Sequence, residues 1–263
     1  MLVLAAVSVA VLRAHSASGG GGAPVLRVYL CAAAEKAWKE IIPLFERETG
    51  VRVEAVYGSS GFLLAQLERV GGDIYAPASP YYMRLAEQRG LVDSGSVRVV
   101  AYLYPVILVP RGNPAGVHGL EDLARPGLRV GLGDPRSVAV GRYAERLLRR
   151  LGLWDAVARH AVYAANVAQL TAYVATGAVD AAITWHVNHY WYPNRTEVVW
   201  IPCRLWESLG PSYIPIAVAR GSKHPGLAKK FIEFVTESPE ARRILARYHY
   251  GLDRLPEMCG EGG

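Results

Sequence analysis

The pattern that points most directly to chemistry is a short loop of glycines and serines. Residues 57–61 read Tyr-Gly-Ser-Ser-Gly and stand between an expected strand at 51–57 and an expected helix at 62–70. The glycines let the backbone turn tightly, and the start of the helix presents N–H groups without internal partners. The hydroxyls of Ser59 and Ser60 add donors. The pattern is typical of an anion site, and a serine that only caps the helix would look the same.

A second loop of this kind, residues 133–143, follows an expected strand at 128–132 and leads into an expected helix at 140–151. It opens with Gly-Asp-Pro, which also suits an ordinary turn before a capped helix. Its glycines lack the third member that a dinucleotide-binding fingerprint needs, and the chain has no Gly-Lys-Ser/Thr triplet. We therefore expect neither a dinucleotide site nor a P-loop.

Residues 185–192 form a dense cluster of aromatic side chains and histidines. His186 and His189 are three apart, so on a helix they would share a face and could hold a metal. Tyr81 and Tyr82 could add phenolate ligands. A receptor for a metal or a metal chelate is therefore the alternative function, although such clusters are more often packed rims with hydrogen-bonded histidines.

Signatures of catalysis are missing from the sequence. There is no Gly-x-Ser-x-Gly elbow and no His-Glu-x-x-His metalloprotease motif. No candidate nucleophile or acid–base pair falls in the region expected to form a cleft. We predict that the protein is not an enzyme and uses no cofactor.

The elements that must position these loops alternate along the chain. Short β-rich runs and stretches of helical periodicity succeed one another, which favours a mostly parallel sheet with helices on its faces. The expected strands are 26–30, 51–57, 73–76, 128–132, 181–184, 198–202 and 214–219. The expected helices are 34–49, 62–70, 80–89, 140–151, 167–176, 225–236 and 239–248.

Two apolar runs, near 99–109 and near 214–219, are the natural places for the chain to pass between two lobes. We therefore predict an α/β protein with lobe I formed by residues 25–108 and 200–263, and lobe II formed by residues 109–199. A cleft between them would lie at the carboxyl ends of the strands, where open α/β sheets bind ligands.

The N-terminal segment differs from the rest of the chain. An apolar run at 2–12 is too short to span a bilayer and suits a signal peptide, and four glycines follow at 19–22. We predict that residues 1–24 are a signal peptide or an N-terminal anchor with a glycine-rich linker. The protein would then be exported to the cell surface or periplasm. A buried N-terminal strand is the structural alternative.

The charge balance and the cysteines narrow the classes of partner. The formal charge is +6 and the pI about 9.3, which favours anionic partners. The arginines are scattered and nucleic-acid signatures are missing, so we expect no nucleic acid. Cys31, Cys203 and Cys259 have no zinc-site spacing and are too few for a disulfide scaffold, but one bridge with one free thiol would fit.

With these motifs in order, the chain resembles the molybdate- and tungstate-type binding proteins of ABC importers. The resemblance covers about residues 26–251, and no single motif decides it. Its landmarks are the alanines 32–34, the serine loop 57–61, Gly-Asp-Ile-Tyr at 72–75, Gly-Asp-Pro at 133–135 with Gly141, Leu-Gly-Leu-Trp-Asp at 151–155, and residues 213–218.

The resemblance implies a two-lobed type II periplasmic-binding-protein fold, acting as a monomer that delivers a tetrahedral oxyanion to a membrane permease. Molybdate or tungstate would be held between the lobes by neutral donors. The ligand-binding residues that it implies are Ala33, Ser59, Ser60, Val140, Val167 and Trp185.

Two of these positions depart from the family's pattern. The family usually has a serine hydroxyl at the position of Ala33 and a tyrosine hydroxyl at that of Trp185. A lost hydrogen bond to a charged group costs roughly 1.5–3 kcal/mol. The indole N–H of Trp185, or Cys31 or His186 nearby, could replace the missing donors, and another oxyanion or a larger anion stays open.

Overall fold

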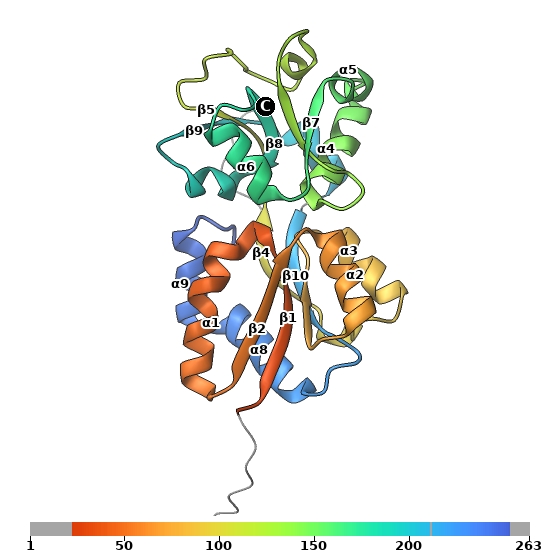
Figure 1. Ribbon diagram of the computed structural model, residues 1–263, viewed down its shortest axis with the longest axis vertical. Coiled ribbons are helices and arrows are strands. Elements are labelled where there is room, and N and C mark those ends of the chain that lie inside the picture. The colour runs from red at the N-terminus through yellow and green to blue at the C-terminus, as the bar shows by residue number, and fades with distance from the viewer. Residues whose placement is uncertain (1–22, 211, 253–263) are drawn as a thin grey trace, which may run out of the picture.

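The computed structural model describes residues 23–210 and 212–252 and shows two lobes, one above the other in Figure 1. Each lobe has a five-stranded sheet with helices on its faces. The predicted two-lobed α/β fold is confirmed. The predicted signal peptide or anchor falls almost wholly outside the described residues. Among the described residues, no helix is long and apolar enough to cross a membrane.

Lobe I is built on a sheet with the strand order β2-β1-β3-β10-β4. Its strands are β1 (Val25–Cys31), β2 (Arg52–Gly58), β3 (Ile74–Ala76), β4 (Arg98–Leu103) and β10 (Ser212–Val218). Its helices are α1 (Glu35–Thr49), α2 (Ser60–Val70), α3 (Pro80–Gln88), α8 (Pro225–Glu237) and α9 (Pro239–Arg247). The one-turn helices η1 (Ala32–Ala34) and η2 (Ser94–Ser96) complete it. Fully buried Trp38 and Phe45 pack α1 on the core, and the Phe45 ring meets the Phe231 ring edge-on at 5.0 Å.

Lobe II has the strand order β7-β6-β8-β5-β9. Its strands are β5 (Pro105–Pro110), β6 (Val130–Gly133), β7 (Ala161–Ala164), β8 (Ala181–Trp185) and β9 (Thr196–Trp200). Its helices are α4 (Ala139–Arg150), α5 (Trp154–Ala158) and α6 (Val167–Ala175), with short turns η3 (Glu121–Ala124) and η4 (His186–Trp191). The short helices α7 (Cys203–Trp206) and η5 (Glu207–Leu209) lie in the connection that returns to lobe I.

In each sheet four strands run in the same direction and one strand runs in the opposite direction, for the same reason in both lobes. Strand β10 pairs antiparallel with β3 and β4, and β5 pairs antiparallel with β8 and β9. Each of these strands directly follows a crossing between the lobes, so it starts at the lobe boundary and runs away from it. The remaining described strands point their carboxyl ends toward that boundary, which places the loops after β1, β2, β6 and β8 together.

The chain passes between the two sheets at Tyr104 and again between the end of β9 and the start of β10, so the run expected as the second passage, 214–219, lies within lobe I. Strand β5 belongs to the lobe II sheet, so the first crossing is at Tyr104. Lobe I was expected to end at residue 108, but residues 105–108 belong to lobe II and not to lobe I. Because both β4 and β5 are buried, the sequence shows them as one apolar run. Strand β9 ends at Trp200, next to the expected second boundary.

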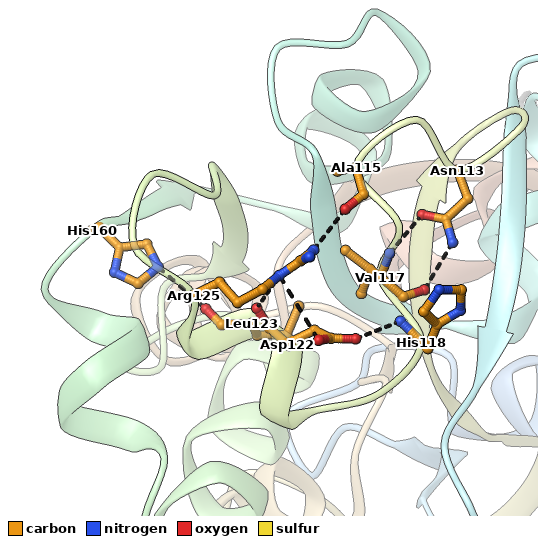
Figure 2. A network of polar contacts seen from close by, with 8 residues as sticks. All are labelled: Asn113, Ala115, Val117, His118, Asp122, Leu123, Arg125 and His160. Carbon is orange, nitrogen blue, oxygen red and sulfur yellow. Dashed lines mark hydrogen bonds and ion pairs between the residues drawn. The ribbon is translucent and has the colours of Figure 1, made fainter.

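The connection between β5 and β6 is held by the polar contacts shown in Figure 2. The Asn113 amide donates to the Val117 carbonyl at 2.8 Å and accepts from its N–H at 3.0 Å. The Arg125 guanidinium donates to the Ala115 carbonyl at 2.6 Å. Asp122 accepts from the His118 N–H at 2.7 Å, and this bond lowers the pKa of its carboxyl. These contacts fix a connection of lobe II and contribute no residue to the lobe boundary.

Candidate functional site

A small cavity of about 10 Å³ lies at the boundary between the lobes. This is roughly the volume that one water molecule needs, so the cavity admits only a compact ligand. The cavity is lined by Cys31, Ala32, Ala33, Gly58, Ser59, Ser60, Ala78, Val138, Ala139, Val140, Val167 and Trp185.

Every residue that the sequence analysis assigned to the ligand site lines this one cavity. Ala33, Ser59 and Ser60 come from lobe I, and Val140, Val167 and Trp185 come from lobe II. Sequence reasoning did not assign Ala32, Gly58, Ala78, Val138 or Ala139, and it named Cys31 only as a substitute donor. Most of these neighbours stand next to an assigned residue, whereas Ala78 lies two residues beyond β3 and carried no signal.

Helices α2, α4 and α6 all begin at the cavity. Ser60 and Val167 are the first residues of α2 and α6, and Val140 is the second residue of α4. The first amides of a helix have no partner within the helix, and the helix dipole makes this end positive. Three such ends around one cavity favour a negatively charged ligand.

The start of α4 is held close to its sheet by two glycines. A Cβ on Gly141 would lie 2.1 Å from the Gly133 carbonyl oxygen, so a side chain there would push the helix away from β6. A Cβ on Gly133 would in turn lie 2.7 Å from the Val138 Cγ1, so both positions favour glycine. This close packing sets the place of the Val140 amide at the cavity wall.

The Ser60 hydroxyl has a defined orientation. Its Oγ accepts a hydrogen bond from the Ala78 N–H at 3.0 Å, and the side chain is 2% exposed. Because this bond uses an oxygen lone pair, the hydroxyl hydrogen is left to donate elsewhere. The Ser60 carbonyl is also engaged, since it accepts from the Tyr75 hydroxyl at 2.9 Å. Ser60 is therefore a fixed donor at the cavity.

The Ser59 hydroxyl is not used to cap α2. Ser59 occupies the N-cap position in an extended conformation, but no side-chain hydrogen bond caps the helix. The structure therefore does not show the alternative in which the Ser59 side chain only caps α2. The hydroxyl stands at the cavity, with Ser59 9% exposed.

The lining carries no charged side chain. Its one titratable group is the thiol of Cys31, which is free and 1% exposed. Burial raises the pKa of this thiol to about 12, so it stays neutral at physiological pH. Cys203, by contrast, is disulfide-bonded. The polar groups of the cavity are thus hydroxyls, one thiol and backbone amides.

Trp185 ends β8 at the cavity and is 1% exposed. Its ring meets the Tyr143 ring edge-on, with centroids 5.5 Å apart and an interplanar angle of 67°. The Tyr143 hydroxyl in turn donates to the Trp206 carbonyl at 3.2 Å, in the connection between the lobes. The indole is thus held by a packed neighbour. Its N–H has no hydrogen-bond partner in the described part of the chain.

The lobes touch on more than one side of the cavity. The Gly61 N–H donates to the Ser137 carbonyl at 2.9 Å, and a Cβ on Gly61 would lie 2.9 Å from the Ser137 Cα. The Tyr82 hydroxyl donates to the Arg136 carbonyl at 3.1 Å, and the Lys36 ammonium to the Trp191 carbonyl at 3.1 Å. The structure is therefore a closed one, and closure needs a glycine at position 61.

The residues of the metal alternative are engaged in structural contacts. His186 accepts from the Tyr104 N–H at its Nδ1 (3.1 Å) and donates from its Nε2 to the His249 carbonyl (2.9 Å), which uses both ring nitrogens. Burial lowers its pKa to about 4. His189 Nδ1 contacts the Thr196 hydroxyl at 3.0 Å.

The two tyrosines of that alternative lie on α3, in the other lobe. The Tyr82 hydroxyl donates to the Arg136 carbonyl, and the Tyr81 ring lies under the Arg142 guanidinium, 3.7 Å from the ring centroid. Among the described residues, no group of three or more histidines, cysteines and acids could hold a metal ion. These contacts favour structural roles for all four residues.

Comparison with known proteins gives a consistent result. The chain is 28% identical over 228 residues to a putative ABC transporter substrate-binding lipoprotein, YvgL, of Bacillus subtilis strain 168, covering 86% of this chain and 85% of that one. It is 24% identical over 231 residues to the molybdate-binding protein ModA of Escherichia coli K12, covering 86% and 88%.

Among solved structures, a periplasmic thiamin binding protein superposes with a TM-score of 0.74 at 16% identity, over 90% of this chain and 86% of that one. At this identity the likeness shows the fold alone. The profile of bacterial extracellular solute-binding proteins matches residues 26–251, nearly all of the described chain. The chain therefore belongs to the family of bacterial extracellular solute-binding proteins.

Proposed function

We propose that the protein is the solute-binding component of an ABC importer, and that it captures a tetrahedral oxyanion, molybdate or tungstate, for delivery to a membrane permease. The observation that carries the proposal is the closed cavity. Three helix starts and two serine hydroxyls meet there, and no charged side chain lines it. The relatives that share this family include the E. coli molybdate-binding protein.

The donor set suits an anion that carries no proton. Amides, hydroxyls and the indole N–H all offer hydrogens, and the lining has no carboxylate or histidine to accept one. A doubly charged oxyanion gains a charge-assisted bond from each donor, whereas a protonated phosphate would bring a hydrogen that only hydroxyl, thiol or backbone carbonyl groups could accept. We infer that molybdate, tungstate and sulfate fit this chemistry and that phosphate does not.

At Ala33 and Trp185 the site lacks the side-chain hydroxyls that the family usually has. Ala33 can offer only its backbone N–H, because its carbonyl accepts from the Tyr250 hydroxyl at 2.5 Å and its side chain has no donor. The indole N–H of Trp185 takes the place of one hydroxyl. We infer that it binds an oxygen of the ligand, as do the N–H groups of Val140 and Val167.

The proposed role includes place and partners. The protein works as a monomer outside the cytoplasmic membrane, and its N-terminal segment is removed or tethers it to the surface. It catalyses no reaction. Opening of the lobes releases the anion to the permease.

The test is a thermal-shift panel on the full chain with molybdate, tungstate, sulfate, phosphate and ferric citrate. A ligand at a hundred times its dissociation constant adds about 2.7 kcal/mol to the free energy of unfolding. For a chain of this size we expect a rise in Tm of roughly 5–10 °C with molybdate and tungstate, and none with phosphate. A rise with ferric citrate alone would instead support the metal-chelate alternative.

A further inference from the structure

A second hollow crosses the lobe boundary away from the cavity. This rim groove has a volume of about 330 Å³. One wall is α3, with Tyr81 and Arg84, and the other is α4, with Tyr143 and Arg146. The two helices lie on the same side of the molecule, at the right in Figure 1, one in each lobe. Tyr213 of β10 lines the groove where the chain re-enters lobe I.

The groove is basic and its charges are not neutralised. Arg84 and Arg146 are exposed and make no ion pair or hydrogen bond, and no acid lines the groove among the described residues. Arg149, one turn further along α4, shows the usual surface arrangement, since it pairs with Glu145 at 2.9 Å. Arg146, on the groove side of the same helix, has no carboxylate partner of this kind among the described residues.

The groove depends on closure of the lobes. The Arg142 guanidinium of lobe II lies 3.7 Å from the centroid of the Tyr81 ring of lobe I, a cation–π contact across the boundary. Arg146 lies one turn along α4 from Arg142, and Arg84 one turn along α3 from Tyr81. When the lobes part, the Tyr81–Arg142 contact breaks and the arginines of the two walls separate.

We propose that the rim groove docks an acidic loop of the permease, and that it is the electrostatic part of a surface that exists only in the closed protein. The proposal rests on the proposed function as an importer component. Guanidinium groups form paired hydrogen bonds with carboxylates, so Arg84 and Arg146 would each take one Asp or Glu side chain. A groove that needs both lobes lets the permease distinguish the closed protein from the open one.

The experiment compares two full-length double variants with the same change of charge. Arg84→Glu/Arg146→Glu reverses the groove, and Arg47→Glu/Arg111→Glu reverses two exposed arginines whose side chains also lack partners, one near the end of α1 and one directly after β5. Docking to the detergent-solubilised permease of the importer is measured by surface plasmon resonance with saturating molybdate. Molybdate affinity is measured in parallel by calorimetry.

We expect docking of the groove variant to weaken at least about tenfold, mainly through a slower association rate, while the control docks like the wild type. The wild-type association rate should fall with added salt, and the groove variant should lose much of this dependence. Molybdate affinity should be the same in all three proteins. Docking of the groove variant at the control's affinity would overturn the proposal.

The two proposals fail separately. If the wild type docks through the groove but binds no molybdate, the groove stands and the proposed ligand is wrong. If all three proteins bind molybdate and dock equally well, the ligand stands and the groove is wrong.

Discussion

The two walls of the cavity use different chemistry. The lobe I wall presents two side-chain hydroxyls in addition to the start of α2, and the Ser60 hydroxyl is oriented by the Ala78 N–H. The lobe II wall presents the starts of α4 and α6, where Val140 and Val167 have apolar side chains and offer only backbone amides. Trp185 is the one side-chain donor on that wall. Substitutions should therefore affect ligand binding strongly on the lobe I wall, and on the lobe II wall only at Trp185.

The largest loss of molybdate affinity is expected for a substitution at Gly61, where the two lobes touch. Gly61→Ala places a Cβ 2.9 Å from the Ser137 Cα and so opposes closure. Overpacking costs about 1–3 kcal/mol, so molybdate affinity should fall by up to about 100-fold. Gly226→Ala is the matched control, because Gly226 is also the second residue of a helix and its Cβ would meet nothing within 4 Å. Calorimetry that finds equal affinity in both variants would show that this contact does not limit closure.

Removing one oriented hydroxyl comes next. Ser60→Ala deletes a donor to the anion, at a cost of about 2 kcal/mol or roughly 30-fold in the dissociation constant. Val140→Ala on the opposite wall keeps the backbone N–H, so its dissociation constant should match the wild type even if its Tm falls. If both variants lost affinity equally, the contrast between the two walls would be wrong.

A smaller loss is expected at the indole. Trp185→Phe keeps an aromatic ring beside Tyr143 and removes the indole N–H together with part of the bicyclic ring, which should weaken molybdate binding by about 1 kcal/mol, or roughly fivefold. Trp154→Phe is the control, because Trp154 lies on α5 and does not line the cavity. Tighter binding in Trp185→Phe would mean that the indole only narrows the cavity.

The pH dependence of folding stability tests the contacts of His186 at the first crossing between the lobes, and not the cavity. Burial lowers the pKa of His186 from 6.5 to about 4, so the unfolded chain takes up a proton more readily than the folded one. The stability that His186 contributes is present above pH 6.5 and is lost as the pH falls toward 4, by up to about 3 kcal/mol. Urea titrations at pH 7 and pH 4.5 should show this loss in the wild type and in the control His118→Gln, and a smaller one in His186→Gln. An equal loss in His186→Gln would assign the acid sensitivity to other groups.

The sequence predicts the fold and the two loops at the cavity because these follow local rules, whereas Ala33, Val140, Val167 and Trp185 are assigned from the resemblance to the molybdate- and tungstate-type binding proteins. Glycine- and serine-rich turns before helices mark the starts of α2 and α4, and the βα alternation brings them to one boundary. What it misses depends on contacts between distant segments. The Ala78 N–H that orients Ser60 and the Tyr81–Arg142 contact join residues that no local pattern connects.

The first lobe crossing and the role of His186 also could not be predicted from local sequence patterns. The apolar run 97–109 predicts buried strands, but the change of sheet at Tyr104 leaves no local mark because both strands are buried. The spacing of His186 and His189 favours a metal pair, whereas the partners of His186 come from the first crossing and from the segment after α9. Only the tertiary structure shows that its ring nitrogens are already used.

The central claim is that one fully deprotonated oxyanion binds between the lobes through neutral donors. Calorimetric titration with molybdate near pH 7, repeated in buffers of different ionisation enthalpy, tests it most directly. We predict one molybdate per chain and a binding enthalpy that does not change with the buffer, because the one titratable group in the lining, the Cys31 thiol, stays protonated. Absence of binding, or uptake of a proton with the anion, would contradict the account.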